Sequence, residues 1–567
     1  MSKNGQNLIE LARQKFGTLT EAEEKLFQAV ADAEVADYSA EDEEDNDPAG
    51  ANNWGPERVL DANSIAWLCT DKRASDLVTH SGIQLKGGRI VGKLDLEFTK
   101  ILFPLIFVRS SIPQEMNLLH VEIPVLILDG THTGTIKADG LKVAGSVFLR
   151  NGFEAEGELR LLSATIGGDL DCSNGQFIGQ NGRALNADGL KVAGSVLLRN
   201  GFEAEGEVNL RGATIGGNLE CEDGQFINPN ECALKGNQLN VMGSVFLHFG
   251  FIAKGEVRLP SASIGSNLEC DKGQFINPNG AALNGEGLKV AGNVFLREGF
   301  KAEGKVDLFG ANIGKSFQWR DVILPEKAEL DLRFAKIGTL RDDPNSWPES
   351  GKLLLHGLVY DQIHDKAPRD AKSRIEWIRL QYDNRAEEVK GQFRSQPYEQ
   401  LAAVFRKSGL DEDAKKILID KNRDIARLTK LTLSERFRHG LFGLIIAYGY
   451  DPWRAVWFGL VIVLVGWLFF WAGYRADVLT LANEGPDTSG GFHALVYSLD
   501  VFVPLVDLRQ ASYWLPNANR AGKVRISDNI NIAVSGKVLR YYFWFEIIAG
   551  WVLTTLLVVG VTGLVRT

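Results

Sequence analysis

Two kinds of hydrophobic pattern divide this chain. Up to about residue 340, short apolar or alternating runs such as Ser195-Val-Leu-Leu198 and Gly206-Glu-Val-Asn-Leu210 are separated by Gly, Asn and Asp. Such runs are too short for helices and are typical of brief strands joined by turns. From residue 354 the apolar positions recur at helical spacing, and two long apolar runs follow near the C-terminus. The pattern therefore predicts a β domain, a helical region and a membrane module.

The strand-like part carries an internal repeat with a step of 49 residues. The run that begins Gly140-Leu-Lys-Val-Ala-Gly recurs from Gly189, in altered form from Gln238, and again from Gly287. The same step relates Ile166, Ile215, Ile264 and Ile313; Phe153, Phe202, Phe251 and Phe300; and Cys172, Cys221 and Cys270. A single turn cannot bury its own apolar side, whereas stacked turns bury it continuously. We therefore predict a parallel β-helix over residues 83–340, with roughly ten turns or more at about 4.8 Å each.

The repeat resembles that of bacterial pentapeptide-repeat proteins, which form parallel β-helices. Leu185 and Leu190 lie five residues apart, as that family would place them, although the five-residue spacing stops soon afterwards. We expect the three repeated cysteines to be small core residues, because ligands of one metal ion would have to lie much closer than a whole repeat. The resemblance implies the parallel β-helix fold.

The flanking segments differ in composition from the repeat. We expect a helical N-terminal segment (1–36), an acidic linker (37–53) and a helical cap (54–82). In the first of these, Thr20 and Glu23 are spaced as a capping box. Residues 37–47 hold seven acidic residues and no basic one, which is typical of a solvated linker. After the β-helix, helical spacing predicts hairpins of helices over residues 354–430.

Two uncharged apolar runs, 455–473 and 547–565, are each long enough to span a bilayer. Aromatic and basic residues flank them, as interfacial anchors do; the candidates are Arg436, Arg438, Trp453, Arg454, Tyr541 and Trp544. Basic residues are frequent over 421–438, and residues 431–454 predict a basic helix along the inner interface. No secretory signal is visible. We therefore expect an inner (plasma) membrane protein whose β-helix and both termini are cytoplasmic.

The connection between the spans, residues 474–546, is unusually apolar for a loop. Its segment 492–508 favours a helix at first and stops at Pro504. The order of interfacial helix, span, half-helix and span resembles two-transmembrane pore-loop ion channels, in which the half-helix dips into the membrane. The Thr-Val-Gly-Tyr-Gly filter of potassium channels is missing, and Pro504 to Asp507 stand in its place. The resemblance therefore implies a pore loop without potassium selectivity.

Three acidic residues lie in or beside these apolar surroundings: Asp500, Asp507 and Glu546. Charge at membrane depth is costly unless it is paired or faces water. One interpretation makes them a ring that attracts cations in an oligomer. The other pairs Glu546 with Arg540 or Arg509 and leaves the two aspartates as caps of the half-helix.

Composition and motifs argue against several classes of function. With 62 Lys and Arg against 72 Asp and Glu, the net charge of -10 does not favour a nucleic-acid binder. The eight histidines are scattered, and neither a Walker loop nor a nucleophile elbow is present. We expect no enzyme activity and no cofactor.

Two functions stay open. The first is an oligomeric ion channel whose β-helix acts as a cytoplasmic sensor or gate, with a cytoplasmic protein or small ligand as its partner. The second is a membrane-tethered scaffold whose β-helix binds a protein partner without conduction. Both expect contact with the lipid bilayer, and the channel also requires a homo-oligomer. A channel needs segment 492–508 inside the membrane, whereas a scaffold does not.

Overall fold

The structure, a computed structural model, describes residues 2–382, 393–429, 431–482, 491–527 and 530–562. It divides into two compact units. One takes in the described residues up to 382 together with helix α6 (Gln396–Lys407), and the other takes in residues 393–395 and the described residues from Leu410 onward.

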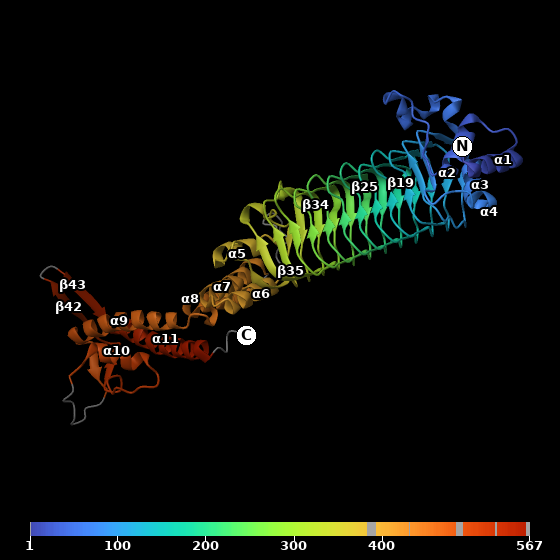
Figure 1. The fold of residues 1–567 in the computed structure, drawn as a ribbon. Helices are drawn as coiled ribbons and strands as arrows, with labels where there is room; N and C mark the ends of the chain where they lie inside the picture. Colours follow the sequence, from blue (N-terminus) through green and yellow to red (C-terminus); the bar gives the residue numbers. More distant parts are fainter. Residues whose placement is uncertain (1, 383–392, 430, 483–490, 528–529, 563–567) are drawn as a thin grey trace. The chain divides into compact units, whose positions relative to one another are not determined.

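The first unit is built on a parallel β-solenoid of about twelve turns over residues 83–363 (Figure 1). Most strands are two residues long, as in β20 (Lys191–Val192), and pair in parallel with strands of the neighbouring turns. The predicted parallel β-helix is confirmed. It extends beyond residue 340 through β38 (Leu353–Leu354) and β39 (Val359–Ile363), where the sequence no longer follows the repeat.

Each 49-residue repeat corresponds to two turns of unequal length. Leu170 pairs with Val147, 23 residues before it, and with Val196, 26 residues after it. The longer turns contain an irregular strand of 11 residues, which occurs as β19 (Gln176–Asn186), β25 (Gln225–Lys235) and β31 (Gln274–Asn284). Register shifts inside these strands absorb the extra residues. The five-residue spacing is interrupted for this reason.

Aromatic rings form a continuous ladder inside the solenoid. Consecutive ring centroids lie 5.1 to 5.7 Å apart along Phe153, Phe177, Phe202, Phe226, Phe251, Phe275, Phe300 and Trp319. Tilted and edge-on pairs at this distance add to the stabilisation from burial. The three repeated cysteines are also fully buried, which confirms them as core residues, and burial raises the pKa of their thiols.

Helices cover the N-terminal end of the solenoid: α1 (Lys3–Phe16), α2 (Glu21–Asp32), α3 (Ala62–Thr70) and α4 (Lys72–Ser75). The predicted capping box of Thr20 and Glu23 begins α2, and Ser64 Oγ on α3 donates to Glu23 Oε1 at 2.7 Å. Strands β1 (Ala36–Asp37) and β2 (Val59–Asp61) pair with the first strands of the solenoid, β3 (Ile83–Lys86) and β4 (Arg89–Val91).

Residues 37–53 are folded rather than a linker. They contain the last residue of β1 and the 3-10 turns η1 (Glu44–Asn46) and η2 (Pro48–Asn53). The buried Asn46 side chain accepts from Ala40 N and donates to the carbonyls of Ala40 and Asp42. These hydrogen bonds close the acidic segment into a compact loop, which its high charge alone does not reveal.

Helices α5 (Ala371–Arg379) and α6 cover the C-terminal end of the solenoid. Gln396 on α6 accepts from Gly357 N at 2.7 Å and donates to Leu358 O at 2.9 Å, and Gln400 donates to Tyr360 O at 2.8 Å. These side chains satisfy backbone groups in the last strand, β39, and just before it, where the solenoid would otherwise present an open edge to another chain.

The second unit is mainly helical: α7 (Asp411–Leu428), α8 (Leu433–Ile446), α9 (Trp453–Arg475), α10 (Ala494–Phe502) and α11 (Gly536–Thr562). Short antiparallel pairs accompany them, β40 (Leu479–Leu481) with β41 (Trp514–Pro516) and β42 (Ala521–Ser527) with β43 (Ile530–Ser535).

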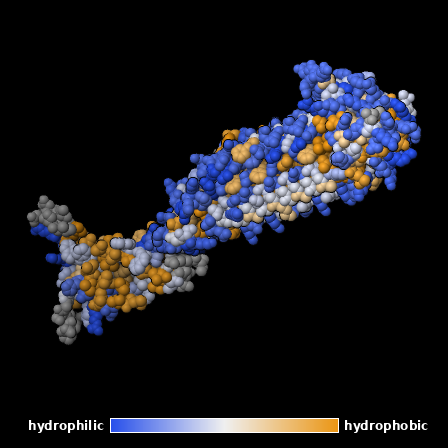
Figure 2. Space-filling view, in the orientation of Figure 1, coloured by the Kyte–Doolittle hydropathy of each residue, from blue (hydrophilic) through white to orange (hydrophobic). Residues whose placement is uncertain are grey.

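Helices α9 and α11 are long and apolar enough to cross a membrane. Figure 2 shows that apolar surface gathers over this part of the chain. Helix α11 begins before the apolar run that predicts it. The end of that run and the C-terminal tail, residues 563–567, lie outside the described residues.

Candidate functional site

Helix α10 packs closely against both apolar helices, because glycines face it. A side-chain atom at Gly459 of α9 would lie 2.8 Å from the ring of Phe502, and one at Gly550 of α11 would overlap Phe502 O. At Gly466 of α9 it would overlap Ser498 Oγ. The absence of a side chain at these positions lets α10 pack closely between α9 and α11.

The segment around α10 enters and leaves at the same end of the helix pair. At that end, the rings of Tyr474, Phe492 and Trp514 have centroids 4.6 to 5.5 Å apart. Further along, Ser498 Oγ lies 2.9 Å from Val463 O in the middle of α9. The C-terminal end of α10 reaches Gly459, beyond the middle of α9. The chain then turns back through residues 503–513, which we call the return segment.

Asp500 holds the return segment in place. Its carboxylate accepts from the backbone N–H groups of Leu508 at 2.5 Å, Gln510 at 2.8 Å and Ala511 at 2.7 Å. Hydrogen bonds to a charged acceptor are stronger than neutral ones. These bonds hold the return segment and do not involve the backbone of α10 itself, so they decide neither for an ion-attracting group nor for a cap of the half-helix.

Asp507 lies on the exposed side of the return segment. Its carboxylate accepts from Arg509 N at 2.8 Å, within its own loop. The preceding Leu505 is 81% exposed. Pro504, which directly follows the C-cap residue of α10, cannot continue the helix. Neither helix nor strand forms between residues 503 and 513.

Glu546 on α11 is completely buried against α10. Its Oε1 accepts a short hydrogen bond from Ser498 Oγ, and its Oε2 has no hydrogen-bond partner among the described residues. The expected pairing with Arg540 does not occur, because that guanidinium donates to Pro516 O at 2.9 Å. In a single chain, then, the three acidic residues have separate partners and do not form one cluster.

The candidate interface anchors are on the surface of the second unit. Helix α8 exposes an apolar stripe, with Leu433 86% and Phe437 74% exposed, beside the exposed Arg436 and Arg438. Trp453 and Arg454 begin α9, and Arg454 Nε lies 2.9 Å from Asp451 Oδ2. On α11, Tyr541 and Trp544 are both exposed, with ring centroids 5.8 Å apart.

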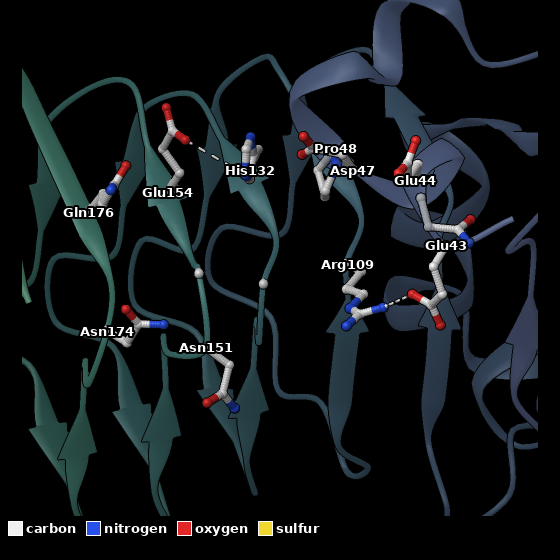
Figure 3. A pocket seen from close by; sticks show the side chains of 13 residues that line it. Glu43, Glu44, Asp47, Pro48, Arg109, His132, Asn151, Glu154, Asn174 and Gln176 are labelled. Atoms are coloured by element: carbon white, nitrogen blue, oxygen red, sulfur yellow. Dashed lines mark hydrogen bonds and ion pairs between the residues drawn. The ribbon is translucent and has the colours of Figure 1, made fainter. Parts of the chain in front are cut away.

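A polar pocket of about 570 Å³ lies on the flank of the solenoid in the first unit. Figure 3 shows the folded acidic loop facing successive solenoid turns across it, with an ion pair between Arg109 and Glu43 and a contact of 3.6 Å between His132 Nε2 and Glu154 Oε2. Sequence reasoning missed this pocket, because it forms only when residues 37–53 fold back onto the solenoid. Among the described residues, no group of three or more His, Cys, Asp or Glu side chains could hold a metal ion.

Comparison of the chain with protein-family models, with curated proteins and with solved structures found no match in any of the three. The fold and the arrangement around α10 are therefore the basis for assigning a function.

Proposed function

We propose that the second unit is the subunit of an oligomeric ion channel, in which the return segments of several copies surround a water-filled path. The observation that carries the proposal is the position of the return segment, an exposed stretch without regular structure beside two apolar helices. Non-helical backbone at membrane depth is tolerated only where protein covers it or water reaches it. If α9 and α11 span the bilayer, the exposed Asp507 needs the same protection.

In this proposal α8 lies along the inner face of the membrane. Its apolar stripe would enter the interface, while Arg436 and Arg438 would meet acidic headgroups. The positive-inside rule then places the solenoid in the cytoplasm, where it acts as a sensor or gate for a protein or small-ligand signal.

Two aspartates would have different roles in the channel. Asp507 would face the path and raise the local concentration of cations, whereas Asp500 would position the backbone that carries it. Asp507→Asn is expected to keep the fold and to lower the preference for cations over anions, on the order of tenfold at low salt. Asp500→Asn is expected to abolish the current, because losing charged acceptors for three N–H groups costs at least about 2 kcal/mol.

Conductance of the purified protein in planar bilayers tests this prediction. Asp477→Asn is the matched control, because Asp477 belongs to the same unit but forms only an exposed ion pair with Arg520, at 3.3 Å. It should leave both current and selectivity unchanged. Unchanged selectivity in Asp507→Asn would remove Asp507 from the path. No current from any variant, together with a monomeric particle, would leave the tethered scaffold as the better interpretation.

A further inference from the structure

Glu546 is a buried carboxyl group that the proposed ion path does not use. It lies on α11 and is completely buried, and neither of its oxygens pairs with a basic side chain of the described chain. Its Oε1 contacts Ser498 Oγ on α10, whereas its Oε2 has no hydrogen-bond partner among the described residues. An ionised carboxylate at this position would be a buried charge without a partner, which is strongly unfavourable.

The hydroxyl group of Ser498 has one hydrogen but two oxygens within reach. Val463 O on α9 lies 2.9 Å from Ser498 Oγ, and Glu546 Oε1 contacts the same hydroxyl. A backbone carbonyl can only accept, but a carboxyl group that carries a proton can donate. The heavy-atom positions allow either group to be the donor in the contact between Ser498 and Glu546. With a proton on Glu546, the carboxyl donates to Ser498 Oγ and the hydroxyl donates to Val463 O, so both contacts become hydrogen bonds.

This chain of hydrogen bonds joins the three helices at their closest approach. A Cβ atom at Gly466 of α9 would overlap Ser498 Oγ and both carboxyl oxygens of Glu546. The missing side chain therefore lets groups from α10 and α11 meet against the backbone of α9. The proton on Glu546 would thus lie where α9, α10 and α11 pack together.

The ionisable groups around Glu546 supply no positive charge. Tyr497 on α10 and Tyr542 on α11 interact with Glu546, but each hydroxyl donates to a backbone carbonyl, at 2.9 and 2.7 Å respectively. Asp500 on α10 is itself acidic and binds the return segment. The basic side chains of the three helices lie near the helix ends: Arg454, Arg475, Lys537 and Arg540.

We propose that Glu546 is a proton-binding site that locks α10 between α9 and α11. With the proton bound, the carboxyl group is neutral and completes the chain of hydrogen bonds. When the proton leaves, a buried charge without a partner remains, and α10 must move until water reaches the carboxylate. Because Asp500 on α10 holds the return segment, release of α10 would shift that segment as well. The proton site does not depend on whether the protein conducts ions.

Infrared spectroscopy of the full-length protein in lipid nanodiscs tests the charge state of Glu546, because the C=O stretch of a carboxylic acid differs from that of a carboxylate. At neutral pH, the difference spectrum between the wild type and Glu546→Gln should contain the carboxylic-acid band. The band should disappear reversibly from the wild type as the pH is raised, which can be followed without any variant. Glu412→Gln is the matched control, because Glu412 belongs to the same unit but forms an exposed ion pair with Lys415, at 2.6 Å. It should leave the band unchanged.

Hydrogen exchange of the α10 amides, followed by mass spectrometry, tests the lock. Glutamine is neutral at every pH, so the wild type and Glu546→Gln should protect α10 equally at neutral pH. The protonated form is the packed one, so packing is lost as the pH rises. Release of one proton shifts such an equilibrium by up to about tenfold per pH unit. At alkaline pH, the α10 amides of the wild type should exchange at least tenfold faster than those of Glu546→Gln at the same pH.

Three results would overturn the proposal. A difference spectrum without a carboxylic-acid band at neutral pH would show that Glu546 is ionised there. Equal exchange of α10 in the two proteins at a pH where the band has disappeared would separate the proton from the packing of α10. Faster exchange of α10 in the wild type when choline replaces sodium at neutral pH would show that the bound cation is a metal ion instead of a proton.

Discussion

Replacing Arg374 with methionine is expected to destabilise the first unit by about 3–5 kcal/mol, because it leaves a buried carboxylate without its partner. The guanidinium of Arg374 is completely buried and binds Asp342 through two hydrogen bonds of 2.9 and 2.6 Å. Its Nε donates to Pro368 O at 2.8 Å. This pair joins α5 to the last turns of the solenoid, so its loss should release the C-terminal cap.

Urea unfolding of the full-length protein in detergent, followed by far-UV circular dichroism, measures this effect. Arg369→Met is the matched control: Arg369 forms an exposed ion pair with Asp365, and pairs of this kind contribute about 0–1 kcal/mol. The double variant Arg374→Met/Asp342→Leu should recover much of the loss, since it removes both buried charges. Equal stabilities of the two arginine variants would show that the buried pair does not hold the cap.

Gly550→Ala is expected to displace α10 from its packed position between α9 and α11, although alanine has a higher helix propensity than glycine. At a solvent-exposed helix position, this substitution would stabilise the helix by about 1 kcal/mol. At Gly550 the new methyl group would overlap the carbonyl oxygen of Phe502, where backbones approach closely. Overpacking of this kind lowers the free energy of unfolding by about 1–3 kcal/mol. We expect the upper end of this range for Gly550→Ala, because the backbone at Phe502 cannot move aside easily.

Gly440→Ala provides the comparison, because nothing lies within 4 Å of a side chain added at that position of α8. The thermal stability of the two variants in detergent should change in opposite directions. A stabilised Gly550→Ala would contradict the close packing of α10 against α11 and, with it, the position of the return segment.

The repeat predicts the solenoid because a buried turn needs the same small set of apolar residues each time, and Phe153 or Cys172 then recur with a constant step. Sequence alone does not show that the two turns of one repeat differ in length, since the register shifts within β19 depend on pairing between neighbouring turns. It also ends the solenoid too early, because β38 and β39 continue the stack without the repeat's residues. The acidic loop is misjudged for a related reason: Asn46 folds it through local backbone bonds rather than through apolar contacts.

The sequence shows which residues around α10 are unusual for an apolar segment, but it does not show which groups they bind. An acidic residue in an apolar run draws attention to Asp500 and Glu546, whereas their partners come from the return segment and from Ser498. Glycines explain the arrangement better than charges do, since Gly466 and Gly550 permit the contact.

The measurement that tests the channel most directly is the mass of the full-length particle, obtained by native mass spectrometry from lipid nanodiscs. One chain has a mass of 62.4 kDa, and a single two-span subunit cannot enclose a path. We predict a discrete multiple of this mass that persists in Asp507→Asn. A particle of one chain under the same conditions would contradict the proposal, because the return segment would then have no second copy to cover it.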